Sequence, residues 1–294
     1  MEKHKKITRN RSKGFILGLR SLLRSKLGLT GFIIFLIACV TAVFAPIIAP
    51  HNPAQINTAH MFVPPVWMEG GMREYILGTD NLGRDVLSRV IYGTQISLLV
   101  GILAVVVSGA IGLVLGLVAG FYGGFIDNAL MRVVDAFLAI PNILFMLVIL
   151  GVLGPSLWTL IIVLGVTNWI IYARMIRGEV LSIKEREYVM ASRSIGTKNF
   201  QIIFKHVLPN VFSSFIVIST LSVATTIILE ASLSFLGLGV QAPTVSWGGM
   251  LSEGRNHLAT SWWIATFPGI AITITVLGII FMGDWLRDLL DPRS

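Results

Sequence analysis

The sequence predicts an all-α integral membrane protein with six transmembrane helices, and three observations support this fold class. Hydrophobic residues make up 54% of the 294 residues and charged residues only 13%, and the mean hydropathy is +0.80. Soluble domains carry about twice that share of charged residues. Several charge-free runs are long enough to cross a bilayer, which requires about 20 residues, and the basic residues gather on one side of them.

The charge-free runs define the predicted spans in chain order. The run from Ala136 to Ala173 is too long for one crossing, and Gly154-Pro155-Ser156 divides it into a third and a fourth span. Pro268 predicts a kink in the last span. The predicted spans are Leu27–Ala49, Ile96–Phe121, the two halves of Ala136–Ala173, Val207–Leu229 and Leu258–Gly283.

Lysine and arginine residues predict the orientation of these spans. Nineteen of them fall on the side that holds both termini and a long polar segment, and four fall on the other side. Because basic residues accumulate in cytoplasmic loops, both termini and the polar segment are predicted to be cytoplasmic. The predicted regions are a basic tail 1–26 with an interfacial helix at Phe15–Arg24, a first transmembrane helix 27–49, an external loop 50–94, a five-helix core 95–283 and a cytoplasmic C-terminus 284–294.

The polar segment, at about 174–210, is the most informative stretch, because a connection between two helices needs only a few residues. Within it, Glu187–Ile195 predicts a helix that ends at Gly196, since glycine commonly follows the last turn of a helix. A second short helical run is predicted to stop at Pro209. A compact helix with small residues on one face and basic residues around them is suited to docking in a groove of another protein.

Motifs for catalysis and nucleotide binding are absent from the sequence. Glycine is nowhere followed by lysine, so there is no phosphate-binding P-loop. The histidines are scattered without ligand spacing, and the single cysteine, Cys39, lies in the first span, so neither a metal site nor an intrachain disulfide is predicted. We therefore expect no catalytic centre and no cofactor in this chain. Any ATP and Mg would be used by partner subunits.

The polar segment resembles the EAA loop of ATP-binding-cassette importer permeases. That loop has the pattern Glu-Ala-Ala, three residues, glycine, nine residues and Ile-x-Leu-Pro. The spacing holds here, while Met190, Ser192 and His206 replace the glutamate, the second alanine and the isoleucine of the family pattern. The alternative is an ordinary interfacial helix-turn-helix. The resemblance implies a loop that docks ATPases through Tyr188, Met190, Ala191, Ser192 and Gly196 and ends at Leu208-Pro209.

A second block, Leu77–Gly93, is similar to the signature "LGTD…GRD…SR…YG" that precedes the second span in dipeptide, oligopeptide and nickel permeases. Gly78 and Gly83 are predicted to supply turns. The charged residues of the block can pair at helical spacing just outside the membrane. A purely structural role for these pairs is the alternative. The charged residues are Asp80, Arg84, Asp85 and Arg89.

Two further blocks extend the resemblance almost to the end of the chain. Glu230–Gln241 is similar to the link between spans five and six of the same subfamily, and Gly283–Arg293 is similar to its C-terminus. The chain thus resembles the second, C-type permease subunit of peptide and nickel importers. The resemblance implies a type I importer bundle in a bacterial or archaeal cytoplasmic membrane that moves short peptides. It also implies a homologous second permease in a heterodimer, two cytoplasmic ATPases and an extracytoplasmic solute-binding protein as partners.

Two features inside the spans admit both a functional and a structural interpretation. Glu230 is the one acidic residue well inside a span. It is a candidate pathway residue for a substrate amine or a metal, but we favour a capped or protonated acid at a helix end. Gly112, Gly116 and Gly120 repeat every four residues and leave a ridge on which another helix can pack closely. Packing within the chain is favoured over a subunit interface.

Other functions are weighed against peptide import. Nickel or metal-chelate import is the alternative within the family, because the external binding protein largely selects the cargo. A stand-alone secondary transporter would need ionisable relay residues in several spans, and Glu230 is the sole candidate. A scaffold or receptor would need a sizeable domain outside the membrane. The net charge of +8 comes from basic residues beside apolar spans, which favours membrane lipid over nucleic acid as their partner.

Overall fold

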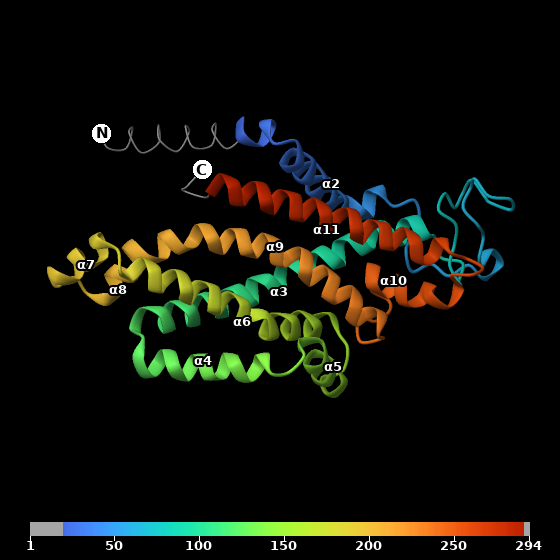
Figure 1. The fold of residues 1–294 in the computed structure, drawn as a ribbon. Helices are drawn as coiled ribbons and strands as arrows, with labels where there is room; N and C mark the ends of the chain where they lie inside the picture. The colour runs from blue at the N-terminus through green and yellow to red at the C-terminus, as the bar shows by residue number, and fades with distance from the viewer. Residues whose placement is uncertain (1–19, 291–294) are drawn as a thin grey trace.

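The computed structural model describes residues 20–290, and within them the chain folds into helices joined by turns (Figure 1). The β-type pairing in these residues is limited to an isolated bridge between Thr79 and Asp85. The all-α fold class predicted from the sequence is confirmed. The predicted tail 1–26 and its interfacial helix Phe15–Arg24 lie mostly outside the described residues, of which 20–24 are helical.

Within residues 20–290, five helices are long and apolar enough to cross a membrane, and a bent pair of helices can supply a sixth span. The bent pair is α4 (Gly124–Leu138) and α5 (Asn142–Leu153), which meet at an angle of 83°. The five long helices are α2 (Lys26–Ile48), α3 (Val86–Tyr122), α6 (Leu157–Lys184), α9 (Leu208–Phe235) and α11 (Trp263–Leu290).

Polar side chains cap the first turns of three of these helices, α2, α3 and α6. The Ser25 hydroxyl accepts a hydrogen bond from the Gly28 amide at 3.1 Å at the start of α2. The Asp85 carboxylate accepts one from the Ser88 amide at 2.9 Å at the start of α3, and the Ser156 hydroxyl accepts one from the Thr159 amide at 3.1 Å at the start of α6. Such contacts satisfy amides that have no partner inside the helix. At these three helices, a polar residue before the apolar run therefore helps to fix where the helix begins.

The longest helix, α3, occupies the centre of the bundle. Its 37 residues extend about 55 Å at about 1.5 Å per residue, whereas the hydrocarbon core of a bilayer is about 30 Å thick. It packs along α6 and also contacts α2 and α9, and α11 packs against α2 and α9 (Figure 1). The first turns of α3 therefore project beyond the apolar layer and carry polar residues to one end of the molecule.

The glycine ridge of α3 faces α6. A Cβ atom at Gly116 would lie 2.7 Å from the Ile176 Cβ and 2.8 Å from the Ala173 carbonyl oxygen. Because only glycine leaves room for so close an approach, the ridge packs within the chain. A Cβ atom at Gly112 or Gly120 would likewise meet side chains of α6, those of Tyr172 and Val180.

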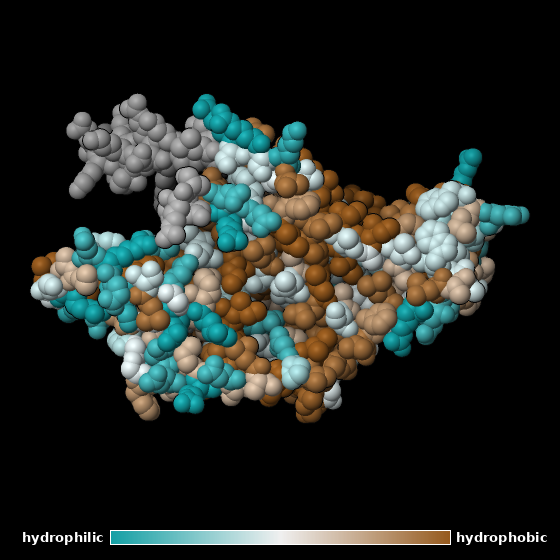
Figure 2. Space-filling view, viewed as in Figure 1, coloured by the Kyte–Doolittle hydropathy of each residue, from teal (hydrophilic) through white to brown (hydrophobic). Residues whose placement is uncertain are grey.

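The two ends of the bundle carry different structures (Figure 1). The short helices α7 (Glu187–Ser194) and α8 (Asn199–Ile202) lie at one end, as do the start of α2 and the end of α11. The irregular segment 50–85 and α10 (Trp247–Gly254) lie at the other end. In Figure 2, hydrophobic side chains cover the middle of the face, and hydrophilic ones gather at the end that carries α7. The remaining short elements are the 3-10 turns Thr58–His60 and Arg255–His257 and the π-helical turn Ile203–Val207.

The third predicted span needs correction. The sequence interpretation started it at Ala136 as a straight helix, but the chain is already helical from Gly124 and breaks just before Pro141. Proline disfavours helical backbone in the preceding residue, so the 83° bend between α4 and α5 falls there. The predicted division at Gly154-Pro155-Ser156 does separate α5 from α6.

Four further boundaries differ from those predicted. α3 begins at Val86, inside the predicted external loop 50–94, and α6 continues to Lys184, inside the predicted polar segment. α11 begins at Trp263 rather than Leu258 and extends to Leu290. Charged residues mark where the apolar layer ends, whereas a helix continues into water when its polar side chains are solvated or paired. The boundaries of apolar runs are therefore not the boundaries of helices.

Candidate functional site

The segment predicted to dock a partner contains a short helix that ends in a tight turn. At the end of α7, the Gly196 amide donates to the Arg193 carbonyl at 3.0 Å and the Thr197 amide donates to the Ser192 carbonyl at 3.2 Å. These two bonds form a Schellman motif, which needs left-handed backbone just after the helix. Gly196 supplies that backbone with a φ of +79°. Glycine thus ends the helix where the sequence predicts it.

Buried aliphatic side chains attach this segment to the bundle. Val189 of α7 and Ile202 of α8 are fully buried and lie in one hydrophobic cluster with Phe121 of α3, Val180 of α6 and Val211 of α9. Protein interiors are close-packed, so they transmit displacement rather than absorb it. A movement of α7 is therefore coupled to three of the membrane-spanning helices.

The opposite face of the segment exposes large apolar side chains. Ile195 is 83% exposed and Phe200 is 68% exposed, while Phe204 and Met190 are also exposed. The Phe200 and Phe204 ring centres lie 4.3 Å apart. An exposed apolar patch at the hydrophilic end of a membrane protein is typical of a protein contact. The sequence interpretation missed Ile195, Phe200 and Phe204, although large apolar residues in a polar segment are a readable signal.

The predicted docking residues of α7 interact around His206. The Ser192 hydroxyl lies 3.5 Å from His206 Nε2 and donates to the Tyr188 carbonyl at 2.8 Å. The Tyr188 and His206 ring centres are 5.9 Å apart, and Ala191 is exposed. His206, which stands in the place of an apolar family residue, therefore contacts the two polar docking residues.

The prediction that a second short helical run stops at Pro209 is wrong, whereas the predicted end of the polar segment at Leu208-Pro209 coincides with the start of a membrane-spanning helix. These residues open α9, which continues to Phe235, and the π-helical turn Ile203–Val207 joins α8 to α9. Proline is well tolerated in the first turn of a helix, because the amide that it lacks has no partner there. Here it marks the beginning of a helix and not its end.

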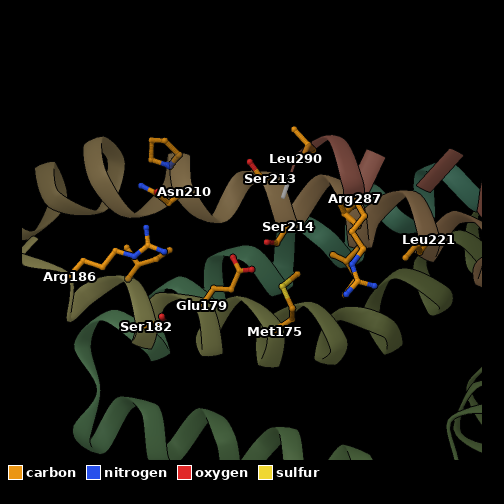
Figure 3. A pocket seen from close by; sticks show the side chains of 14 residues that line it. Met175, Glu179, Ser182, Arg186, Asn210, Ser213, Ser214, Leu221, Arg287 and Leu290 are labelled. Atoms are coloured by element: carbon orange, nitrogen blue, oxygen red, sulfur yellow. The ribbon is translucent and has the colours of Figure 1, made fainter. Parts of the chain in front are cut away.

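A groove of about 810 Å³ lies between α6, α9 and α11, next to the start of α7 (Figure 3). In Figure 3, Glu179 points from α6 toward α9, and Arg287 reaches from α11 toward α6. The sequence interpretation did not find this groove, because its walls come from helices far apart in the chain. Its polar lining consists of Glu179, Ser182, Arg186, Asn210, Ser213, Ser214 and Arg287.

A bidentate ion pair holds α4 against α6 near the same end. Arg177 Nε donates to Asp127 Oδ1 at 2.5 Å, and Arg177 Nη2 donates to Asp127 Oδ2 at 2.7 Å. Lys184 Nζ donates to the Gly120 carbonyl of α3 at 3.2 Å. These contacts connect the helices beneath α7. The sequence interpretation did not identify them, since the ion-paired residues are 50 positions apart.

At the opposite end, the signature block folds around Asp80. This buried carboxylate accepts hydrogen bonds from the Leu82 and Arg84 amides at 2.8 and 3.0 Å, from Arg84 Nε at 2.7 Å and from Arg89. Glu253 of α10 completes the network by accepting from Arg84 at 2.7 Å and from Arg89 at 2.6 Å. The sequence interpretation paired Asp80 with arginine but missed Glu253, which lies 164 positions from Arg89.

Asp85 does not pair as predicted. Its carboxylate caps α3, accepting from the Ser88 hydroxyl at 2.6 Å, and lies 3.4 Å from His51 Nδ1. The expected pair between Asp85 and Arg89 does not form because the Asp85 carboxylate caps the first turn of α3, while Arg89 pairs with Asp80 and Glu253. Gly78 and Gly83 lie in this region with φ of +82° and +70°. The block thus fastens the segment before α3 to α10.

Glu230 lies fully buried between α9, α3 and α10. The Ser234 hydroxyl donates to it at 2.8 Å and the Ser97 hydroxyl at 3.5 Å, and Ser246 is a third hydroxyl partner. The groove of Figure 3 is lined by other residues. This geometry fits the structural interpretation of Glu230, and a role in a transport pathway stays a prediction. Residues 20–290 contain no group of three or more His, Cys, Asp or Glu side chains arranged to hold a metal ion.

Two family models match the chain. The model described as "Binding-protein-dependent transport system inner membrane component" matches residues 112–294, which is more than half of the sequence. The model described as "N-terminal TM domain of oligopeptide transport permease C" matches residues 16–65. The two matches leave residues 66–111 between them, and this stretch contains Asp80, Arg84 and Arg89.

Permease proteins of peptide transport systems align over most of the chain. The dipeptide transport system permease protein DppC of Escherichia coli strain K12 is 44% identical over 270 residues, covering 92% of this chain and 90% of the relative. The di/tripeptide transport system permease protein DppC of Pseudomonas aeruginosa is 41% identical over 274 residues, covering 93% and 90%. The oligopeptide transport system permease protein OppC of Bacillus subtilis is 39% identical over 269 residues, covering 92% and 86%.

Solved structures agree with the fold. Two chains from inward-facing crystal forms of the MetNI methionine ABC transporter align with TM-scores of 0.56 and 0.57 at 21% and 20% identity. Each alignment covers 69% of this chain and 96% of the solved chain. The relatives are named as permease proteins, that is, membrane transport subunits rather than enzymes. This multi-pass membrane chain belongs to the family of binding-protein-dependent transport system inner membrane components.

Proposed function

We propose that the chain is the permease subunit of an ATP-driven importer that moves short peptides across the cytoplasmic membrane of a bacterium or archaeon. The relatives named for dipeptide, di/tripeptide and oligopeptide transport support this substrate class. The observation that carries the proposal is the segment formed by α7 and α8. One of its faces is apolar and exposed, and the other is packed on α3, α6 and α9.

The proposed importer has three kinds of partner. A homologous second permease forms a heterodimer with this chain, two cytoplasmic ATPases bind ATP and Mg, and an extracytoplasmic binding protein delivers the peptide. The absence of a P-loop supports a separate ATPase. The family description, which names dependence on a binding protein, supports external delivery. Membrane lipid surrounds the bundle.

The segment couples the ATPases to the bundle in this proposal. Tyr188, Met190 and Ala191 dock with Ile195 and Phe200 against the ATPases, while Gly196 keeps the turn tight. Closure of the ATPase pair displaces α7, and the buried cluster under Val189 passes the displacement to α3, α6 and α9. Nucleotide must bind the outward and inward states with different affinity, because equal affinity would leave their populations unchanged.

A charge placed on the docking face tests this coupling. Ile195→Asp and Phe200→Asp alter exposed side chains, so both variants should fold. A carboxylate buried without a partner at an interface costs several kcal/mol, so we expect ATP-dependent uptake of dialanine to fall at least tenfold, by about 1.4 kcal/mol or more. The ATPases should also be lost from the purified complex. Uptake and co-purification are measured on the same preparations.

The matched control is Met72→Asp, which changes an exposed apolar side chain at the opposite end of the molecule. It should leave co-purification of the ATPases unchanged. Normal uptake and intact assembly in both loop variants would count against the coupling role. Absence of dialanine uptake by the unmodified complex would instead count against the peptide substrate.

A further inference from the structure

The groove between α6, α9 and α11 carries opposite charges on different walls (Figure 3). Glu179 projects from α6 and faces the Ser214 hydroxyl of α9 and the Arg186 guanidinium. Arg287 enters from α11. Glu179, with Arg186 beside it, therefore faces the same space as Arg287 on another wall.

Apolar side chains line the groove between these charges. Met175 of α6 and Val217, Ile218 and Leu221 of α9 contribute this surface. Ligand sites commonly combine an apolar wall with a few charged or polar groups that fix the orientation of the ligand. The volume of about 810 Å³ lies within the range of about 300–1,000 Å³ that such sites occupy. The groove thus has the size and the composition of a small-molecule site.

The charges belong to helices long and apolar enough to span the membrane. Glu179 lies near the end of α6, and Arg287 lies near the end of α11. A charged side chain in such a helix is retained where it faces water or protein rather than lipid. Glu179 is half-buried and Arg287 is exposed, so both charges keep contact with water.

We propose that this groove binds the main-chain termini of a short peptide on the cytoplasmic side of the transport path. Glu179 receives the terminal ammonium and Arg287 receives the terminal carboxylate. This inference rests on the proposed function, since it names the part of the peptide that the permease recognises. An extended chain spans about 3.3–3.6 Å per residue, so the two termini of a dipeptide or tripeptide are close enough to enter one groove of about 810 Å³.

The assignment of each terminus follows from the chemistry of the side chains. A guanidinium offers a planar fork of N–H donors that matches a carboxylate with two parallel hydrogen bonds. A glutamate carboxylate has about four acceptor positions, so it can bind an ammonium while it accepts from Ser214. Peptide side chains lie along the apolar wall in this arrangement. Recognition of the termini alone lets peptides of different sequence use one site.

Terminally blocked peptides provide a direct test. The probes are dialanine, N-acetyl-dialanine and dialanine amide, titrated into the purified full importer with its ATPases and without the binding protein. We expect the unmodified importer to bind dialanine at least tenfold more tightly than either blocked compound, because a lost charge-assisted pair is worth about 1.4 kcal/mol or more. Glu179→Gln should abolish the discrimination against the N-acetyl compound only. Arg287→Gln should abolish the discrimination against the amide only.

Each variant is expected to lose selectivity at one terminus of the peptide only. This pattern distinguishes recognition of the termini by Glu179 and Arg287 from a structural role of these residues. A variant that weakens binding of all three compounds equally, or that keeps the selectivity of the unmodified importer, would overturn the assignment. Failure of the unmodified importer to bind dialanine would also overturn it. Arg132→Gln and Asp135→Asn, which change exposed charges of α4 outside the groove, are the matched controls and should leave every affinity unchanged.

ATP-driven uptake of dialanine, measured on the same importer after the binding protein has been added, distinguishes the two proposals. If uptake occurs while the selectivity pattern is absent, the site assignment fails and the proposed function stands. If the unmodified importer takes up no peptide, the proposed function itself fails.

Discussion

At the scale of single residues, Asp80 organises the end of the molecule opposite α7. Its buried carboxylate receives two guanidinium groups and two backbone amides, and Glu253 receives the same two guanidinium groups from α10. Two acidic and two basic side chains therefore balance one another in a space where the Asp80 side chain has no contact with solvent. Charges buried in this way are tolerated because each has a partner.

Replacing Asp80 removes one of the two negative charges that balance Arg84 and Arg89. We expect Asp80→Asn to destabilise the protein by about 3–5 kcal/mol, because Arg89 would remain buried without full compensation. The thermal unfolding midpoint of the purified protein in detergent measures this loss. Glu69→Gln is the control, since Glu69 is an exposed acid in the same segment, and it should leave the midpoint unchanged. An unchanged midpoint in Asp80→Asn would show that the network contributes little to stability.

The same network shows what a sequence reveals about single residues. Asp80 and Arg84 are four positions apart, and their pairing was predictable from that spacing. The part played by Glu253 was not, because chain folding alone brings it to Arg84 and Arg89. Glu230 gives a parallel case, since Ser234 is a near neighbour in the chain but Ser97 lies 133 positions away. Local partners follow from spacing, whereas distant partners depend on how helices pack.

At the scale of elements, the contact between α3 and α6 depends on glycine residues of α3, which have no side chain to hold the two helices apart. Gly116 permits the Ala173 carbonyl and the Ile176 side chain of α6 to approach closely. The Ala173 carbonyl belongs to the helix backbone, so it could not rotate away from a side chain added at Gly116. Helices in lipid associate through such close packing, because burial of apolar surface against lipid gives little driving force. The position of α6, and with it the groove, depends on this contact.

We therefore expect Gly116→Ala to destabilise the protein by about 1–3 kcal/mol through overpacking, despite the helix propensity of alanine. The matched control is Gly178→Ala in α6, where an added Cβ meets nothing within 4 Å. The control should be neutral or slightly stabilising, since alanine favours helix by about 1 kcal/mol over glycine. Thermal unfolding of both variants in detergent gives the comparison. Equal midpoints for the two variants would contradict the packing argument.

Elements were predictable where one local signal dominates. The glycine after α7 predicted the end of that helix, and the charge-free runs predicted the membrane spans. The structure has the helix end at Gly196 and long apolar helices in the predicted spans. Proline was misread once, at Pro209, and overlooked once, at Pro141, because its effect depends on position. Pro209 lies in the first turn of α9, where proline is tolerated, and Pro141 follows the break between α4 and α5, which an unbroken apolar run concealed. Hydrophobicity alone located the membrane layer but not the bend inside it.

At the scale of the whole molecule, orientation depends on charge. Nineteen lysine and arginine residues lie on the predicted cytoplasmic side and four lie on the other. The structure places the start of α2, the end of α11 and the α7–α8 segment at one end (Figure 1), which an even number of crossings requires. In the proposed importer, this orientation turns the coupling segment and the groove toward the ATPases and the Asp80 network toward the binding protein.

Cysteine labelling tests this orientation, and the chain is convenient for it because Cys39 is its single cysteine. In a Cys39→Ser background, Met72→Cys and Glu185→Cys place exposed thiols at opposite ends of the bundle. A membrane-impermeant maleimide should label position 72 in intact cells and position 185 only after permeabilisation, because the basic side faces the cytoplasm. Labelling of position 185 in intact cells would place the α7–α8 segment outside. Coupling to cytoplasmic ATPases through that segment would then be impossible, and the groove could not receive peptide on the cytoplasmic side.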